Sequence, residues 1–198
     1  PIGAPALDLI RLRPRDVSSR HWAQLVRGEG DLAAAARLAR AELAARAAAA
    51  GIDVGEMQGL QVAVPSNFDA AALGRVLAVL RAAGWPVAGF VDAAAVLCAA
   101  LGTTRTTIVI DVGLHHLSAA RVTADGDGVR RRAVRARVGQ GLLALQESWL
   151  LLVSEAMVLR SRFDPLHEAA TEQRLYELLE GAAAAAARDG GATISLPV

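Results

Sequence analysis

The chain has 198 residues, with 21 lysine and arginine residues against 20 aspartate and glutamate residues. This near-neutral balance excludes a uniformly basic protein that binds nucleic acid through its overall charge, although a local basic patch stays open. The length allows one ordinary domain or two small ones, each with a hydrophobic core.

The basic residues are all arginine, and the sequence contains no lysine. Together with the many alanines and glycines, this choice of arginine over lysine is typical of a genome with a skewed nucleotide composition. It also means that no lysine of this chain can bind a phosphate or form a Schiff base. The single cysteine, Cys98, lies in an apolar run, so we expect a buried thiol in a reducing compartment. No secretory signal pattern opens the sequence, and we therefore expect a cytoplasmic protein.

The first half of the chain alternates predicted helices and strands. We expect helices over residues 3–13, 17–26, 31–50, 69–83 and 93–101, and strands over residues 60–64 and 87–91. Asp31 and Asp69 are suitable N-caps, while Gly51 and Gly102 follow helices as C-terminal signals. Because helices connect the strands, the strands should be parallel and belong to an α/β layer.

The second half follows a different pattern. We expect three antiparallel strands over residues 107–111, 117–123 and 129–138, with a hairpin over residues 125–128. Two helices should follow over residues 141–162 and 168–188, and a last strand over 193–198 has no partner left in the chain. Polar residues interrupt the apolar stretch 142–159, whereas a membrane-spanning helix needs about 20 apolar residues. We expect a buried amphipathic helix there and no contact with a membrane.

Several stretches resemble the nucleotide-binding domain of the 70-kilodalton heat-shock chaperones, within the actin-like ATPase superfamily. Residues 62–68 (VAVPSNF) resemble the family's TVPAYF, and residues 90–102 (FVDAAAVLCAALG) resemble IINEPTAAALAYG. Residues 108–118 (IVIDVGLHHLS) resemble the second phosphate loop, LVYDLGGGTFD. Weaker similarities cover residues 2–14 and 172–197.

The resemblance implies an α/β, ribonuclease H-like, actin-like ATPase fold, with mixed sheets flanked by helices. Each lobe of such a protein combines a three-strand meander with two further parallel strands. Residues 1–102 would be part of the first lobe, and residues 103–198 part of the second. Both lobes would be incomplete, so we expect a fragment of a longer protein. Two alternatives stay open. The strands could join into one sheet in a circularly permuted order, or another chain could complete the two sheets.

The departures from the family pattern bear on the chemistry. Asp111 and Gly113 match the phosphate loop, but Leu114, His115 and His116 stand where the family has Gly, Gly and Thr. These side chains would fill volume that phosphate oxygens occupy, because only glycine lets the backbone approach a phosphate closely.

Two further departures concern carboxylates. Ser118 replaces the second aspartate of the loop, and Asp92 matches the asparagine of the hinge motif while Ala93 replaces its glutamate. The resemblance thus makes six positions candidates for nucleotide binding, with ATP and Mg²⁺ as the possible cofactors: Asp92, Asp111, Gly113, Leu114, His115 and His116.

Three functions follow as hypotheses. The first is a chaperone-like, non-catalytic binding or scaffold module with a protein partner or a second copy of itself. The second is a Mg²⁺-dependent ATPase, in which Asp111 is the catalytic carboxylate that positions a hydrated ion. A structural alternative for Asp111 is an aspartate that ends a strand and accepts hydrogen bonds from turn amides.

The third hypothesis is a binder of nucleic acid or acidic protein through the arginine-rich strand 130–137. A structural alternative is a solvated edge strand whose charges discourage pairing, and the absence of interleaved aromatic residues disfavours nucleic acid. His115 and His116 are adjacent and would point to opposite faces of a strand, so we expect no metal site there.

Overall fold

The computed structural model describes residues 4–126 and 128–196 of the chain. Its helices are α1 (Ala4–Leu7), α2 (His21–Arg27), α3 (Leu32–Ala49), α4 (Ala70–Ala82), α5 (Ala93–Ala100), α6 (Leu142–Ser161) and α7 (Ala169–Asp189), with a short 3-10 helix η1 (Val54–Glu56). Its strands are β1 (Leu60–Val64), β2 (Val87–Asp92), β3 (Thr107–Val112), β4 (His116–Asp125) and β5 (Gly128–Val138). The predicted α/β class is confirmed.

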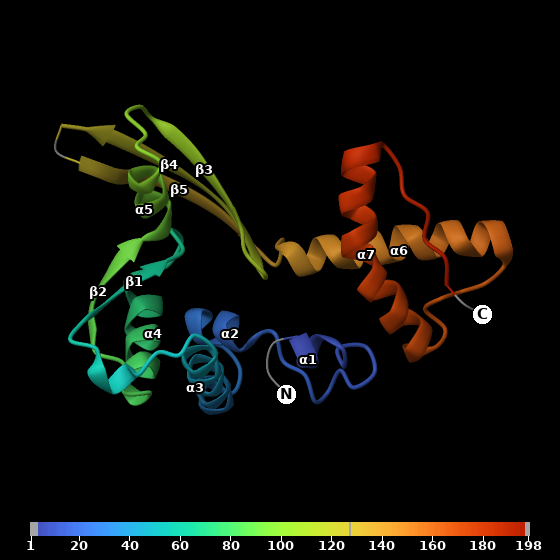
Figure 1. Cartoon of the computed structure of the whole chain (residues 1–198), viewed down its shortest axis with the longest axis horizontal. Helices are drawn as coiled ribbons and strands as arrows, with labels where there is room; N and C mark the ends of the chain where they lie inside the picture. Colours follow the sequence, from blue (N-terminus) through green and yellow to red (C-terminus); the bar gives the residue numbers. More distant parts are fainter. Residues whose placement is uncertain (1–3, 127, 197–198) are drawn as a thin grey trace. The chain divides into compact units, whose positions relative to one another are not determined.

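Two compact units make up the chain (Figure 1). One is Ser19–Gly141, and the other combines Pro1–Ser18 with Leu142–Val198. Both groups of strands therefore belong to the first unit. The assignment of residues 1–102 and 103–198 to two lobes stays a prediction.

Strands β1 and β2 form a parallel sheet, as expected from the helical crossover between them. Their register pairs Val62 with Phe90 and Val64 with Asp92. The crossover helix α4 begins after Asp69, whose carboxylate accepts a hydrogen bond from the amide of Ala72. Its apolar face buries Val76, Val79 and Leu80, which fixes α4 in the unit that carries the sheet.

Strands β3, β4 and β5 form the predicted antiparallel meander. Helix α5 covers one face of it, where Ala94 and Cys98 pack against Ala120 and Val122. Cys98 is buried, as expected from its apolar surroundings in the sequence. The hairpin between β4 and β5 includes residue 127, which lies outside the described residues.

Helices α2, α3 and α4 share a small core of Leu25, Ala35, Ala39 and Val79. Alanine at two of these positions allows the helices to approach closely, which is the structural use of the alanine-rich sequence. Arg75 of α4 donates hydrogen bonds to the carbonyl oxygens of Leu25 and Val26, each at 2.6 Å. These carbonyls end α2, where a cation is favourable.

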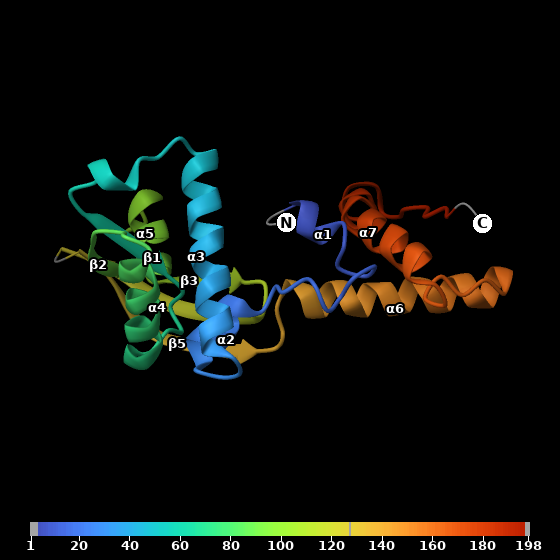
Figure 2. The same ribbon diagram turned by 90° about the horizontal axis from the view of Figure 1, so that it is seen from below.

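The second unit is built on α6 and α7, and Figure 2 shows the two helices side by side. Leu150, Leu175 and Leu179 form its core. The guanidinium of Arg11 bonds Glu147 of α6 at 2.5 Å and Glu172 of α7 at 3.0 Å, which attaches the N-terminal segment. Helix α1 is shorter than expected, since only Ala4–Leu7 is helical within residues 4–13.

Two expectations about this unit are wrong. Helix α6 is not buried. Leu150 and Ser154 are its buried residues, and only 11% of its most apolar 18-residue stretch is buried in the structure. By length and composition it is the one described helix that could cross a membrane. The strand predicted over residues 193–198 is not formed in residues 193–196, and residues 197–198 lie outside the described residues. Instead Ile194 and Leu196 pack against the core of α6 and α7, because this unit offers the described segment no strand to pair with.

Candidate functional site

The turn between β3 and β4 carries most of the candidate residues. Gly113 is followed by Leu114 and His115, and His116 is the first residue of β4. A side chain at Gly113 would collide with the imidazole of His116, so this ring already fills the space beside the glycine. A side chain of the chain itself therefore lies where a ligand would have to approach the backbone of Gly113.

Asp111 lies within β3, two residues before the turn. Its Oδ2 is 3.3 Å from Nε2 of His116, and its side chain is 44% exposed. Directly opposite on β4 lies Ser118, which is buried. The structure thus joins two of the predicted site residues, Asp111 and His116, as a carboxylate–imidazole pair.

His115 fixes the turn from the other side. Its Nε2 lies 2.7 Å from the carbonyl oxygen of Ser19, so a proton on that nitrogen is donated to the segment that precedes α2. The carbonyl of His115 accepts a hydrogen bond from the amide of Gly139 at 2.8 Å. The turn is consequently attached to both ends of the unit, which limits its freedom to rearrange around a ligand.

Gly141 directly precedes α6 and makes a close backbone contact with the turn. It is buried, and a Cβ there would collide with the carbonyl oxygen of Gly113. Only glycine permits this approach of two backbones. The signal in the sequence is the pair Gly139 and Gly141, but the partner of a close backbone contact cannot be read from spacing.

Asp92 has a structural set of partners. Its Oδ1 accepts hydrogen bonds from the amides of Ala94 and Ala95 and from Oγ of Ser66, while its Oδ2 pairs with Nε of Arg131 at 2.7 Å. Asp92 thereby caps α5 and connects the β1–β2 sheet with the meander. Ser66 and Arg131 were missed as partners because they lie far from Asp92 in the sequence.

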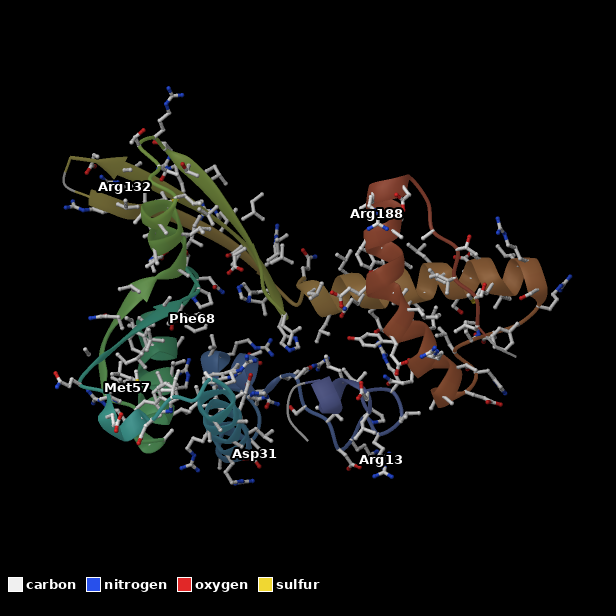
Figure 3. All side chains as sticks on the ribbon, in the orientation of Figure 1. Arg13, Asp31, Met57, Phe68, Arg132 and Arg188 are labelled. Atoms are coloured by element: carbon white, nitrogen blue, oxygen red, sulfur yellow. The ribbon has the colours of Figure 1, made fainter. Side chains whose placement is uncertain are left out.

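Two cavities flank the turn. The smaller, of about 210 Å³, is lined by Ser66, Asp111 and Ser118 together with apolar residues of β3 and α5. The larger, of about 440 Å³, lies among α2, α3, β1 and α4. It is lined by Ser19, Trp22, Ala23, Val26, Arg27, Leu43, Val62, Ala63, Val64, Pro65, Asn67, Phe68, Val76, Leu80, Leu114, His115, His116 and Val138. Figure 3 shows Phe68 just beyond the end of β1.

The side chain of Trp22 is held at the larger cavity by Glu42. The indole donates to Glu42 at 2.8 Å, and His21 lies 2.9 Å from the same carboxylate oxygen. Burial raises the pKa of Glu42, but the hydrogen bonds from His21, Arg46 and Trp22 together outweigh burial and hold that pKa below its usual value. An ionised Glu42 therefore helps to shape the wall of the cavity.

The lining of these cavities does not fit a nucleoside triphosphate, which needs cations or many N–H donors around its negative charges. Arg27 is the only arginine of the larger lining, and it already pairs with Glu29 at 3.2 Å. The ionisable group of the smaller lining is a carboxylate. In the described part of the chain, no group of three or more His, Cys, Asp or Glu side chains could hold a metal ion.

Comparison with known proteins gives no family. No protein-family model matches the chain. No curated protein matches it either.

Proposed function

We propose that this chain is a non-catalytic binding or scaffold module of the chaperone-like, actin-like ATPase type, whose second phosphate loop no longer accepts nucleotide. The observation that supports this most directly is the position of His116. Its imidazole fills the space beside Gly113 and lies against the carboxylate of Asp111. A phosphate and a hydrated cation would compete with that ring for the same place.

The strand patterns support the fold within this proposal. A parallel pair with a helical crossover and a three-strand antiparallel meander are the two parts that a ribonuclease H-like lobe combines. Here they form separate sheets within one unit. A common ancestry with the actin-like ATPases, a cytoplasmic location and a protein partner all belong to the proposal.

A Mg²⁺-dependent ATPase is the second candidate, and one observation favours it. The carboxylate of Asp111 is partly exposed and lines the smaller cavity beside the hydroxyls of Ser66 and Ser118. Carboxylate and hydroxyl oxygens suit a hydrated Mg²⁺. In that case Asp111 would have to release His116 before it could hold the ion.

Release of inorganic phosphate from ATP distinguishes the two candidates. We expect the wild-type protein, Asp111→Ala and the control Asp53→Ala to show the same background rate with and without Mg²⁺. Asp53 is a suitable control because it is an exposed aspartate that only caps η1. A Mg²⁺-dependent rate that Asp111→Ala abolishes and Asp53→Ala retains would establish the ATPase instead.

A further inference from the structure

The outer face of the meander, defined as the face opposite α5, carries two kinds of side chain. Residues that lie directly opposite each other on antiparallel strands share a face. The register therefore places three rows on the outer face: Ile108 with Arg121 and Ala133, Ile110 with Ala119 and Arg135, and Val112 with Leu117 and Arg137. From β3 to β5, the face changes from apolar to basic.

The apolar side of the outer face is open to solvent. Ile108, Ile110 and Val112 are 58%, 68% and 54% exposed, and they alternate with the inward residues of β3. Leu117 on β4 extends this surface and is 37% exposed. Single exposed apolar residues are ordinary, but a continuous row on adjacent strands is typical of an interaction surface.

The basic side consists of Arg121, Arg135 and Arg137, all exposed. Within residues 4–126 and 128–196, none of the three forms an ion pair. Two neighbours on β5 differ in this respect, because Arg131 pairs with Asp92 and Arg132 with Asp125. Figure 3 shows Arg132 on this strand. The three arginines thus leave positive charge beside the apolar row.

We propose that the outer face binds an acidic amphipathic helix of a partner protein. Apolar side chains of that helix would cover Ile108, Ile110 and Val112, and its carboxylates would pair with Arg135 and Arg137. The apolar row on β3 and the arginines on β5 are two strand spacings apart, which is about 9.6 Å. An α-helix is about 10 Å wide and would therefore reach both.

Other occupants match the surface less well. The phosphates of a nucleic acid would pair with the arginines but leave the apolar row in water, and the described residues of this face include no aromatic side chain for a base to stack on. A strand added to the open edge of β3 would be separated from Arg135 and Arg137 by both β3 and β4. The inference rests on the proposed role as a binding module, but not on the state of the phosphate loop.

Fluorescence anisotropy with a labelled synthetic peptide tests the proposal. The peptide forms an amphipathic helix with leucines on one face and glutamates along its flank, and its counterpart carries lysines in place of the glutamates. We expect saturable binding of the glutamate peptide only, weakened about tenfold by Ile110→Asp and about tenfold by Arg135→Glu combined with Arg137→Glu. Arg37→Glu combined with Arg40→Glu on α3 makes the same charge change on exposed residues away from the face and should bind as the wild type does.

Each other outcome overturns the proposal. The glutamate peptide could fail to saturate at about 1 mM, or bind all variants alike. Duplex DNA bound by the wild type and by Ile110→Asp, but not by the arginine variant, would assign the face to nucleic acid. A dimer in light scattering that Ile110→Asp dissociates would assign it to a second copy. Because Ile110 and both arginines are exposed, circular dichroism should show all variants folded, and titration with ATP reports on the phosphate loop separately.

Discussion

The Oδ2 atom of Asp111 and the Nε2 atom of His116 lie 3.3 Å apart, and the imidazole that makes this contact also lies against Gly113. The side chain of His116 thus contacts the carboxylate of Asp111 and also fills the space beside Gly113, the two residues that resemble a phosphate loop. The turn is held further by His115, which bonds the carbonyl of Ser19. A loop with these internal contacts is organised for stability of the turn, and this is the physical basis of the proposed non-catalytic role.

Substitution of Asp92 should destabilise the protein more than the loss of a helix cap alone. Asp92→Ala removes the cap of α5, the acceptor of Ser66 and the partner of Arg131. We expect the free energy of unfolding to fall by about 2 kcal/mol. Asp31→Ala, which removes only the cap of α3, should cost about 1 kcal/mol. Urea denaturation measures both, and equal losses would contradict the role of Asp92 as a link between the two sheets.

Two glycine substitutions should have opposite effects. Gly141→Ala places a methyl group against the backbone of Gly113 and should destabilise the protein by about 2 kcal/mol. Gly181→Ala lies in the interior of α7 with open space around it, and should stabilise the helix by about 0.5–1 kcal/mol. Thermal unfolding followed by circular dichroism compares them. A neutral Gly141→Ala would show that the close backbone approach is not needed.

The stability of the α2–α3 region should depend on pH through Glu42. Hydrogen bonds from His21, Arg46 and Trp22 hold the pKa of Glu42 below its ordinary value of 4.5, although burial alone would raise that pKa. A carboxyl with a lowered pKa stabilises the folded state above about pH 4.5, and this contribution is lost as the pH falls through the folded-state pKa.

Denaturation of Glu42→Gln at several pH values measures this contribution. The variant should lose less stability than the wild type as the pH is lowered below about 4.5. Glu56→Gln, which changes an exposed glutamate of η1, should follow the wild-type curve. Parallel curves for Glu42→Gln and the wild type would contradict the favourable contacts of Glu42.

Replacing a leucine by alanine should change the free energy of unfolding differently on the two faces of α6. Leu150 is 1% exposed in the core with α7, whereas Leu152 is 63% exposed. Leu150→Ala should cost about 3 kcal/mol, and Leu152→Ala should change the free energy of unfolding by less than about 0.5 kcal/mol. Guanidinium denaturation tests this, and a large loss for Leu152→Ala would mean that the exposed face of α6 is covered in solution.

The sequence predicted most elements closely because their signals are local. Asp31 and Asp69, the predicted N-caps, each accept a hydrogen bond from an amide of the first turn of their helix, and β1 spans the predicted residues. The parallel and antiparallel pairings also followed from local signals, namely a helical crossover and short turns. The failures concern tertiary partners. Within the described residues, the last segment has no strand to pair with, and no helix or strand covers the second apolar face of α6.

For the candidate site too, the residues could be identified from the sequence but their tertiary contacts could not. The sequence identified the turn residues, but the contact of His116 with Asp111 and Gly113 depends on how the turn folds back. The ion pair of Asp92 with Arg131 depends on the packing of α5 against the meander, which no short-range pattern encodes. Residue types therefore suggested the chemistry, and only the fold shows which side chains already have partners.

Isothermal titration calorimetry with Mg-ATP, on the wild-type chain and on Asp111→Ala, measures whether the turn at Gly113 binds nucleotide. We expect no saturable heat up to about 1 mM nucleotide for either protein. Micromolar binding by the wild type that Asp111→Ala abolishes would contradict the proposed non-catalytic role, because it would show that the turn at Gly113 accepts nucleotide in spite of His116.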